Sequence, residues 1–178
     1  MLPLKAGDLF ATANPSAVLG RGISAIQKWN SRDNESTYTH AGIITTSGGD
    51  IIESLWRVEI GDLYQRCMGR SLIVARYTEL EESNWNRTFV MLLEHVGKRY
   101  PWWRLPLHIV PPLAKYLSFT GMPVCSELVA KAEHYMGARH RWWTGTCPDT
   151  LVDEWRRWRG FEIVFEGEIN DAFYNLRC

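Results

Sequence analysis

The sequence lacks an excess of either charge, because its 20 lysine and arginine residues are matched by 20 aspartate and glutamate residues. A neutral chain has no overall electric field to attract nucleic acid or an anionic membrane, so nucleic acid is not an expected partner. The sequence also lacks a signal peptide after Met1 and an apolar run of the ~20 residues that a membrane-spanning helix requires. These absences predict a protein that is cytoplasmic as encoded, and they leave delivery elsewhere by a lysis or secretion system open.

Cysteine is scarce, and its positions form no pattern. The cysteines show no C-x-x-C pair and no zinc-type spacing, and they are Cys67, Cys125, Cys147 and Cys178. A chain of this length with so few cysteines is not a disulfide scaffold, so we expect a reducing compartment. The sequence also has no glycine-rich phosphate loop and no cluster of metal-ligating side chains. We therefore expect no cofactor and no metal.

What the sequence does contain is enough apolar residues for a core, with hydrophobic residues making up 46% of its 178 positions. This composition predicts a single domain over residues 1–178. Runs of β-branched and apolar residues predict strands within 4–12 and at 38–46, 51–56, 71–77 and 161–165. Start and stop signals predict helices at 17–29, 85–96, 123–136 and 148–159. A short antiparallel sheet combined with several helices is the α+β class.

A proline- and tryptophan-rich insert at about residues 100–121 interrupts this pattern. Its prolines are Pro101, Pro106, Pro111 and Pro112, and they lie among apolar residues that include Trp102 and Trp103. Prolines at this density break regular structure. We interpret the insert as a candidate lid or binding wall, with a buried connection as the alternative.

The helix that follows the insert has a cysteine at its start. Pro123 suits the first turn, where its missing N–H would be unpaired in any case, and Gly137 ends the pattern. The apolar residues between them recur at three- and four-residue steps, and they are Val124, Leu128, Val129, Ala132, Tyr135 and Met136. Cys125 therefore falls in the first turn, where free N–H groups and the helix dipole favour a thiolate. The alternative is a small buried hydrophobic residue, the usual role of a helical cysteine.

A histidine and a glutamate are predicted to share one face of a β-hairpin. Any even-length turn between the two strands puts Glu53 on the sheet face of His40. A turn centred on Ser47-Gly48 sets Glu53 opposite Gly42. The carboxylate is then diagonal to His40 and within its reach, whereas a turn centred on the two glycines moves it one pair further away. A carboxylate in this apolar strand costs free energy unless it has a partner, and the histidine is the natural one.

A thiol, an imidazole and a carboxylate together form the set that activates a nucleophile. The imidazole of His40 takes the thiol proton, and the carboxylate fixes the imidazole tautomer. Cys125 is the best-placed thiol, because it begins a predicted helix. Cys67 lies in a charged turn, Cys147 precedes a proline and Cys178 is terminal.

Short motifs along most of the chain, from about residue 5 to residue 155, resemble the permuted NlpC-type, papain-like cysteine amidases and peptidases of the YiiX-like group. The motifs are Gly7-Asp8-Leu9, Thr39-His40-Ala41-Gly42-Ile43-Ile44, Ile52-Glu53-Ser54, Ala75-Arg76-Tyr77, Val124-Cys125-Ser126-Glu127-Leu128-Val129 and Cys147-Pro148-Asp149-Thr150-Leu151. No cysteine precedes His40, so only the permuted order of histidine, acid and cysteine is available. The resemblance implies a circularly permuted papain-like fold, with a small antiparallel sheet packed against the helix that bears the nucleophile.

The resemblance also implies roles for the three side chains. Cys125 would be the nucleophile that forms an acyl-enzyme, His40 the general base and acid, and Glu53 the residue that orients His40. The backbone N–H of Cys125 is the expected oxyanion donor, and Tyr38 is a candidate second donor. The substrate would be small, a cell-wall-type peptide or an amide-linked amino acid.

Two other functions stay open. A lipid-directed thioesterase or acyltransferase would use the same three side chains, with a lipid contact through Trp102–Phe119. A non-catalytic module would bind nucleic acid or protein through the Arg- and Trp-rich stretch at 139–159. We favour a solvated helix face with core tryptophans for that stretch. The other histidines are expected to be structural or solvated, and they are His95, His108, His134 and His140.

Overall fold

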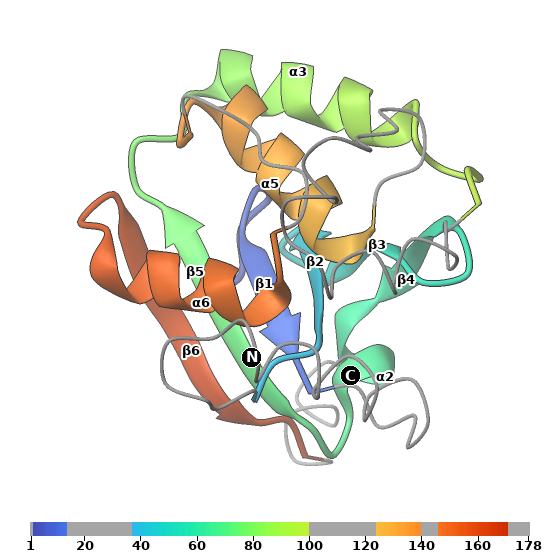
Figure 1. The fold of residues 1–178 in the computed structure, drawn as a ribbon, viewed down its shortest axis with the longest axis vertical. Helices are drawn as coiled ribbons and strands as arrows, with labels where there is room; N and C mark the ends of the chain where they lie inside the picture. Colours follow the sequence, from blue (N-terminus) through green and yellow to red (C-terminus); the bar gives the residue numbers. More distant parts are fainter. Residues whose placement is uncertain (1, 14–36, 100–123, 140–145, 171–178) are drawn as a thin grey trace.

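Six antiparallel strands form one sheet in the order β4-β3-β2-β1-β5-β6 (Figure 1). The computed structural model of the protein describes residues 2–13, 37–99, 124–139 and 146–170. The strands are β1 (Leu9–Thr12), β2 (His40–Ile44), β3 (Asp50–Ser54), β4 (Val58–Asp62), β5 (Ser71–Tyr77) and β6 (Phe161–Glu168). The helices in these ranges are α2 (Leu63–Cys67), α3 (Glu82–Leu93), α5 (Cys125–Met136) and α6 (Pro148–Arg157). The predicted α+β class is confirmed.

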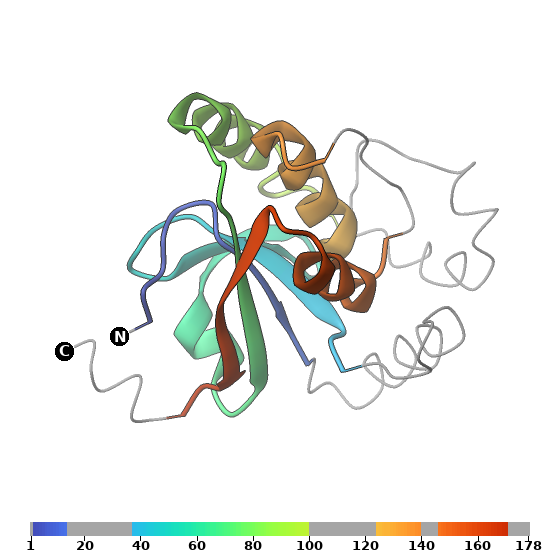
Figure 2. The same ribbon diagram turned by 90° about the vertical axis from the view of Figure 1, so that its left-hand side faces the viewer.

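Each face of the sheet packs against its own helices, so the described ranges contain two hydrophobic cores. Because successive strand residues point to opposite faces, neighbours such as Ile43 and Ile44 enter different cores. In the larger core the sheet packs against α3, α5 and α6, with Leu92, Leu128 and Trp155 among its buried residues. In the smaller core the sheet packs against α2. Figure 2 shows α5 and α6 on one side of the sheet and α2 on the other.

The ends of the helices follow the sequence signals in two cases of three. Gly137 ends α5 in the left-handed conformation, with φ of 87°, which glycine adopts without strain. Pro148 begins α6, where its missing N–H leaves nothing unpaired. The prediction was wrong for α3, because the sequence placed the start at residue 85, after a cap at Ser83-Asn84. The helix begins at Glu82 after Glu81 and has no side-chain cap.

Two elements, β4 and α2, were not predicted. The strand β4 pairs with β3 from Asp50 to Ser54, and it lies at the edge of the sheet. The helix α2 follows at once, and the Asp62 carboxylate accepts a hydrogen bond of 3.1 Å from the N–H of Gln65. The residue Cys67, expected in a charged turn, is buried in the smaller core at the end of α2.

Some predictions concern residues that the structure does not describe. These are the helix at 17–29, the insert at about 100–121, Pro123 and the terminal Cys178. Their structure stays a prediction, as does the single domain over residues 1–178. Within the described ranges, no helix is both long and apolar enough to cross a membrane.

Candidate active site

The β2–β3 hairpin brings His40 and Glu53 into direct contact. Gly42 of β2 pairs with Glu53 of β3, which is the register of a turn centred on Ser47-Gly48. The Nε2 atom of His40 lies 2.7 Å from Oε2 of Glu53. Both side chains are buried, and that of Glu53 is only 2% exposed. Of the two registers that the sequence left open, the structure has the one that puts Glu53 within reach of His40.

The imidazole of His40 is shared between a carboxylate and a thiol. Burial by itself favours the neutral ring, but a hydrogen bond with Cys125 and one with Glu53 outweigh it and raise the pKa of His40 to about 9. Since Nε2 faces the carboxylate, Nδ1 is the ring nitrogen left for the thiol. The ring also packs edge-on against Phe10 of β1, with centroids 6.3 Å apart. His40 is therefore held on three sides.

Cys125 is buried and lies in the first turn of α5, as the sequence predicted, but the helix begins at Cys125 itself and not at the predicted residue 123. The N–H groups of a first helical turn have no partner within the helix, and they stabilise negative charge there. Two other thiols lie in the described ranges. Burial, and then the charge of Glu53, raises the pKa of Cys67 to about 12. Burial, and then the charge of Cys125, raises the pKa of Cys147 to about 11. Of the three described cysteines, only Cys125 forms a hydrogen bond that raises the pKa of His40.

The start of α5 is fixed by two polar contacts. The Glu127 carboxylate accepts a hydrogen bond of 3.3 Å from the N–H of Val124, the residue before the helix. The hydroxyl of Ser126 donates to the carbonyl oxygen of Thr146, just before α6. Ser126 and Glu127, which follow Cys125 in the sequence, therefore fix the position of the start of α5.

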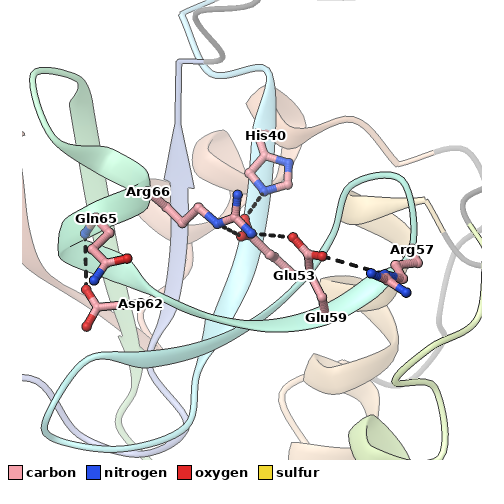
Figure 3. A network of polar contacts seen from close by, with 7 residues as sticks. All are labelled: His40, Glu53, Arg57, Glu59, Asp62, Gln65 and Arg66. Atoms are coloured by element: carbon pink, nitrogen blue, oxygen red, sulfur yellow. Dashed lines mark hydrogen bonds and ion pairs between the residues drawn. The ribbon is translucent and has the colours of Figure 1, made fainter.

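The second oxygen of Glu53 faces a cation that the sequence did not predict. The Nε atom of Arg66, from α2, lies 2.9 Å from Oε1 of Glu53 (Figure 3). This contact is an ion pair without the alignment of a hydrogen bond, because Oε1 has no hydrogen-bond partner. The same guanidinium donates to Glu59 of β4. Arg66 could not be found from the sequence, since its contacts depend on an unpredicted helix.

Two residues of the motifs position strands. The Asp8 carboxylate accepts hydrogen bonds of 2.7 and 2.8 Å from Arg76, which joins the start of β1 to β5. The Asp149 carboxylate accepts from the N–H groups of Thr37 and Tyr38, each at 3.3 Å. Since His40 follows two residues later, the start of α6 helps to place the strand that carries it.

The expected place of Tyr38 is wrong. Alternation along the strand predicted at 38–46 would put Tyr38 on the face of His40, but regular pairing in β2 begins only at His40, and Tyr38 packs in the larger core. Its hydroxyl donates a hydrogen bond of 3.3 Å to Glu166 of β6. Burial, and then the charge of Glu166, raises the pKa of Tyr38. The hydroxyl thus has a partner across the sheet, and we no longer consider it an oxyanion donor.

The described part of the Arg- and Trp-rich stretch contributes to packing. Trp155 is 1% exposed, and its indole N–H donates to Glu133 at 2.6 Å. Arg139 lies 2.8 Å from Glu133 and also contacts Glu154. Trp158, by contrast, is 45% exposed. Trp155 and Arg139 therefore hold α5 and α6 together.

Two of the other histidines have structural contacts. His95 is buried, and its Nδ1 donates a hydrogen bond of 2.8 Å to the carbonyl oxygen of Met91. His134 donates through Nδ1 to the carbonyl oxygen of Arg139 at 2.9 Å. His108 and His140 lie outside the described residues.

No known family model matches the chain, and no curated protein matches it. Among solved structures, the chain is similar to one described as the metalloprotein YiiX from Escherichia coli O157:H7, DUF1105. The two share 14% sequence identity with a TM-score of 0.61, over 93% of this chain and 99% of the other. At this identity the likeness shows the fold alone. A YiiX-like architecture is consistent with the predicted group.

Proposed function

We propose that the protein is a cysteine hydrolase with a permuted papain-like arrangement, in which Cys125 attacks an acyl carbonyl. The observation that carries this proposal is the series of contacts from Cys125 to His40 to Glu53. A thiol at a helix start, next to an imidazole that a buried carboxylate orients, is the arrangement that activates a nucleophile. The YiiX-like fold supports the proposal, since the sequence motifs resemble the same group.

The chemistry runs in two steps. In the first, the Cys125 sulfur bonds to the carbonyl carbon, and the C–N bond then breaks as the His40 imidazolium gives its proton to the leaving amine. The oxyanion between these events is stabilised by the N–H of Cys125 and the positive end of α5. In the second step, His40 takes a proton from water, whose oxygen attacks the thioester. The C–S bond breaks, and the acid is released.

The proposed substrate is a small amide, a cell-wall-type peptide or an amide-linked amino acid. The resemblance of the motifs supports this class. A lipid-directed thioesterase or acyltransferase on the same side chains is the alternative, and its lipid contact at Trp102–Phe119 lies outside the described residues. Released amino groups from peptidoglycan fragments would identify the amidase. Release of fatty acid from an acyl thioester would identify the lipid enzyme.

The described residues do not fit a metal-dependent mechanism. The similar solved structure is called a metalloprotein. In the described ranges of this chain, no three histidine, cysteine, aspartate or glutamate side chains are grouped so that they could hold a metal ion. No step of the proposed chemistry is therefore assigned to a metal.

The experiment that tests the proposal is alkylation by iodoacetamide, with the modified residue located by mass spectrometry. At about pH 6.5 an ordinary thiol is almost entirely protonated and reacts slowly. We expect rapid labelling of Cys125 in the wild type at this pH. His40→Ala and Glu53→Gln should each slow it, by at least about tenfold for His40→Ala.

The other thiols provide the internal control, because Cys67 and Cys147 should label slowly in every variant. Labelling of Cys125 that is slow, or that is equally fast in wild type and His40→Ala, would contradict the proposal. The binding-module function would then take its place, with association that weakens as salt is added.

A further inference from the structure

We propose that Arg66 is a positioning residue of the candidate active site, which holds the Glu53 carboxylate in the orientation that binds His40. The inference rests on the proposed function, because it assigns Arg66 to the same chemistry. Figure 3 shows the arrangement, with Glu53 between the imidazole of His40 and the guanidinium of Arg66.

Each oxygen of Glu53 faces a different positive or polar partner. Oε2 lies 2.7 Å from Nε2 of His40, and Oε1 lies 2.9 Å from Nε of Arg66. Two partners on the two oxygens fix the rotation of the carboxylate about its last side-chain bond. The side chain of Glu53 is 2% exposed, so its carboxylate has little contact with water while Arg66 is in place.

The sheet register explains why a cation is needed at this position. Glu53 of β3 is the direct cross-strand partner of Glu59 of β4. Two like charges directly opposite each other on neighbouring strands repel. Arg66 contacts both carboxylates and thereby offsets the repulsion. Without it, the repulsion would turn the Glu53 carboxylate away from Glu59, and this change weakens its hydrogen bond with His40.

The elements around this pair contain few other charges that could replace Arg66. On α2, Cys67 stays a neutral thiol, because burial raises its pKa to about 12. On α5, Cys125 contacts the other side of the imidazole. Arg57 lies 3.9 Å from Glu59, with its side chain 67% exposed, and so is at the outer end of the network. Arg70 acts on Cys67 through its charge.

Arg66→Gln removes the cation and leaves a shorter, neutral polar side chain, and Arg57→Gln is the matched control. We expect Arg66→Gln to slow labelling of Cys125 at about pH 6.5 by at least about tenfold. Arg57→Gln should stay within about twofold of the wild type, because exposed pairs of this kind contribute little. Arg66→Lys should restore part of the rate, since it returns the charge without the planar fork.

Two further readouts separate positioning from a simple stabilising contact. The imidazole titration of His40, followed by NMR, should move to lower pH in Arg66→Gln because the Glu53 hydrogen bond is lost. Adding Glu59→Gln to Arg66→Gln should return part of the labelling rate, because it removes the repulsion. If only the double variant folds, its labelling rate is compared with that of the wild type. A rate below the wild type supports the inference, and an equal rate and titration contradict it.

Unchanged labelling and titration in Arg66→Gln, with only a lower melting temperature, would overturn the inference. A titration that moves to higher pH would also overturn it, because loss of positive charge would then be the main effect. The proposed function fails separately, if labelling in the wild type does not depend on His40. Dependence on His40 and Glu53 without dependence on Arg66 would remove this inference alone.

Discussion

Gly42 of β2 lies directly opposite Glu53 of β3, and the absence of a side chain at Gly42 leaves room for the ring of Phe10. A Cβ atom at residue 42 would come within 2.6 Å of that ring and 3.0 Å of the carbonyl oxygen of Ile52. The same ring packs against His40. The glycine therefore allows the close packing that holds the imidazole.

Gly42→Ala should destabilise the protein and disturb the site together. The added methyl group must displace Phe10 or separate the strands, at a cost of about 1–3 kcal/mol in the free energy of unfolding. Labelling of Cys125 should slow, because displacement of Phe10 frees the imidazole of His40. Denaturant unfolding and alkylation measure the two effects. In Gly167→Ala, the control on β6, the nearest atom is the side chain of Phe165 at 3.3 Å, and an equal effect there would contradict the explanation.

The imidazole of His40 should titrate near pH 9. Its pKa is raised from 6.5 to about 9 in the fold, so protonation of His40 stabilises the folded state. This contribution is complete below pH 6.5 and is lost as the pH rises through about 9. NMR of the imidazole protons measures the titration, and His40→Gln assigns the signal. Cys125→Ser and Glu53→Gln should each lower the pKa, and titration at or below pH 6.5 in the wild type would show that burial dominates.

Asp149→Ala should loosen the entry into β2. The carboxylate accepts two backbone hydrogen bonds from Thr37 and Tyr38, and their loss should cost about 1 kcal/mol. Labelling of Cys125 should slow less than in His40→Ala, because the imidazole itself remains. Asp153→Ala on the same helix is the control, since its contact with Arg157 is 3.9 Å long and the Arg157 side chain is 64% exposed. Equal changes in melting temperature for the two variants would contradict this role.

Glu133→Ala should reduce stability without affecting the thiol. The carboxylate is 1% exposed and binds Arg139 and the indole of Trp155. Burial raises the pKa of Glu133, and the charge of Arg139 opposes this. Removing one partner of a buried ion pair should cost about 3 kcal/mol in the free energy of unfolding.

The control for this prediction is Glu154→Ala, at the exposed end of the same network. Its side chain is 45% exposed, so its loss should cost less than about 1 kcal/mol. Cys125 should label at the wild-type rate in both variants, because Glu133 lies in the third turn of α5. A loss of labelling in Glu133→Ala would show that the two ends of α5 are coupled.

Elements with a strong local pattern were predictable, and those defined by distant contacts were not. Strands such as β5 have a continuous apolar run, and α5 has its three- and four-residue repeat and a final glycine. In β4, Val58 and Ile60 do alternate with polar residues, but the strand is short, charged and exposed at Ile60. The helix α2 has only five residues, too few for a periodic signal. Its position depends on burial of Leu63 in the smaller core.

In the candidate site, too, contacts within one local element were predictable and contacts between distant elements were not. The contact between His40 and Glu53 could be predicted because one hairpin of known period creates it. The contact of Arg66 could not, because it needs the place of α2 relative to the sheet. The sequence also suggested Tyr38 as a donor, since it could not show that regular pairing begins only at His40.

The side chains of the candidate site come from two parts of the chain that the insert separates. The imidazole, the carboxylate and the guanidinium come from residues 40–66, whereas the thiol comes from residue 125, beyond the insert. The later part is joined to the earlier part by the pairing of β6 with β5 and by α5 against the sheet. Two separately produced pieces, 1–99 and 124–178, would each lack part of the reactive set. If the proposed function holds, we expect association of the two pieces to restore labelling of Cys125, so that thiol reactivity would report their reassembly.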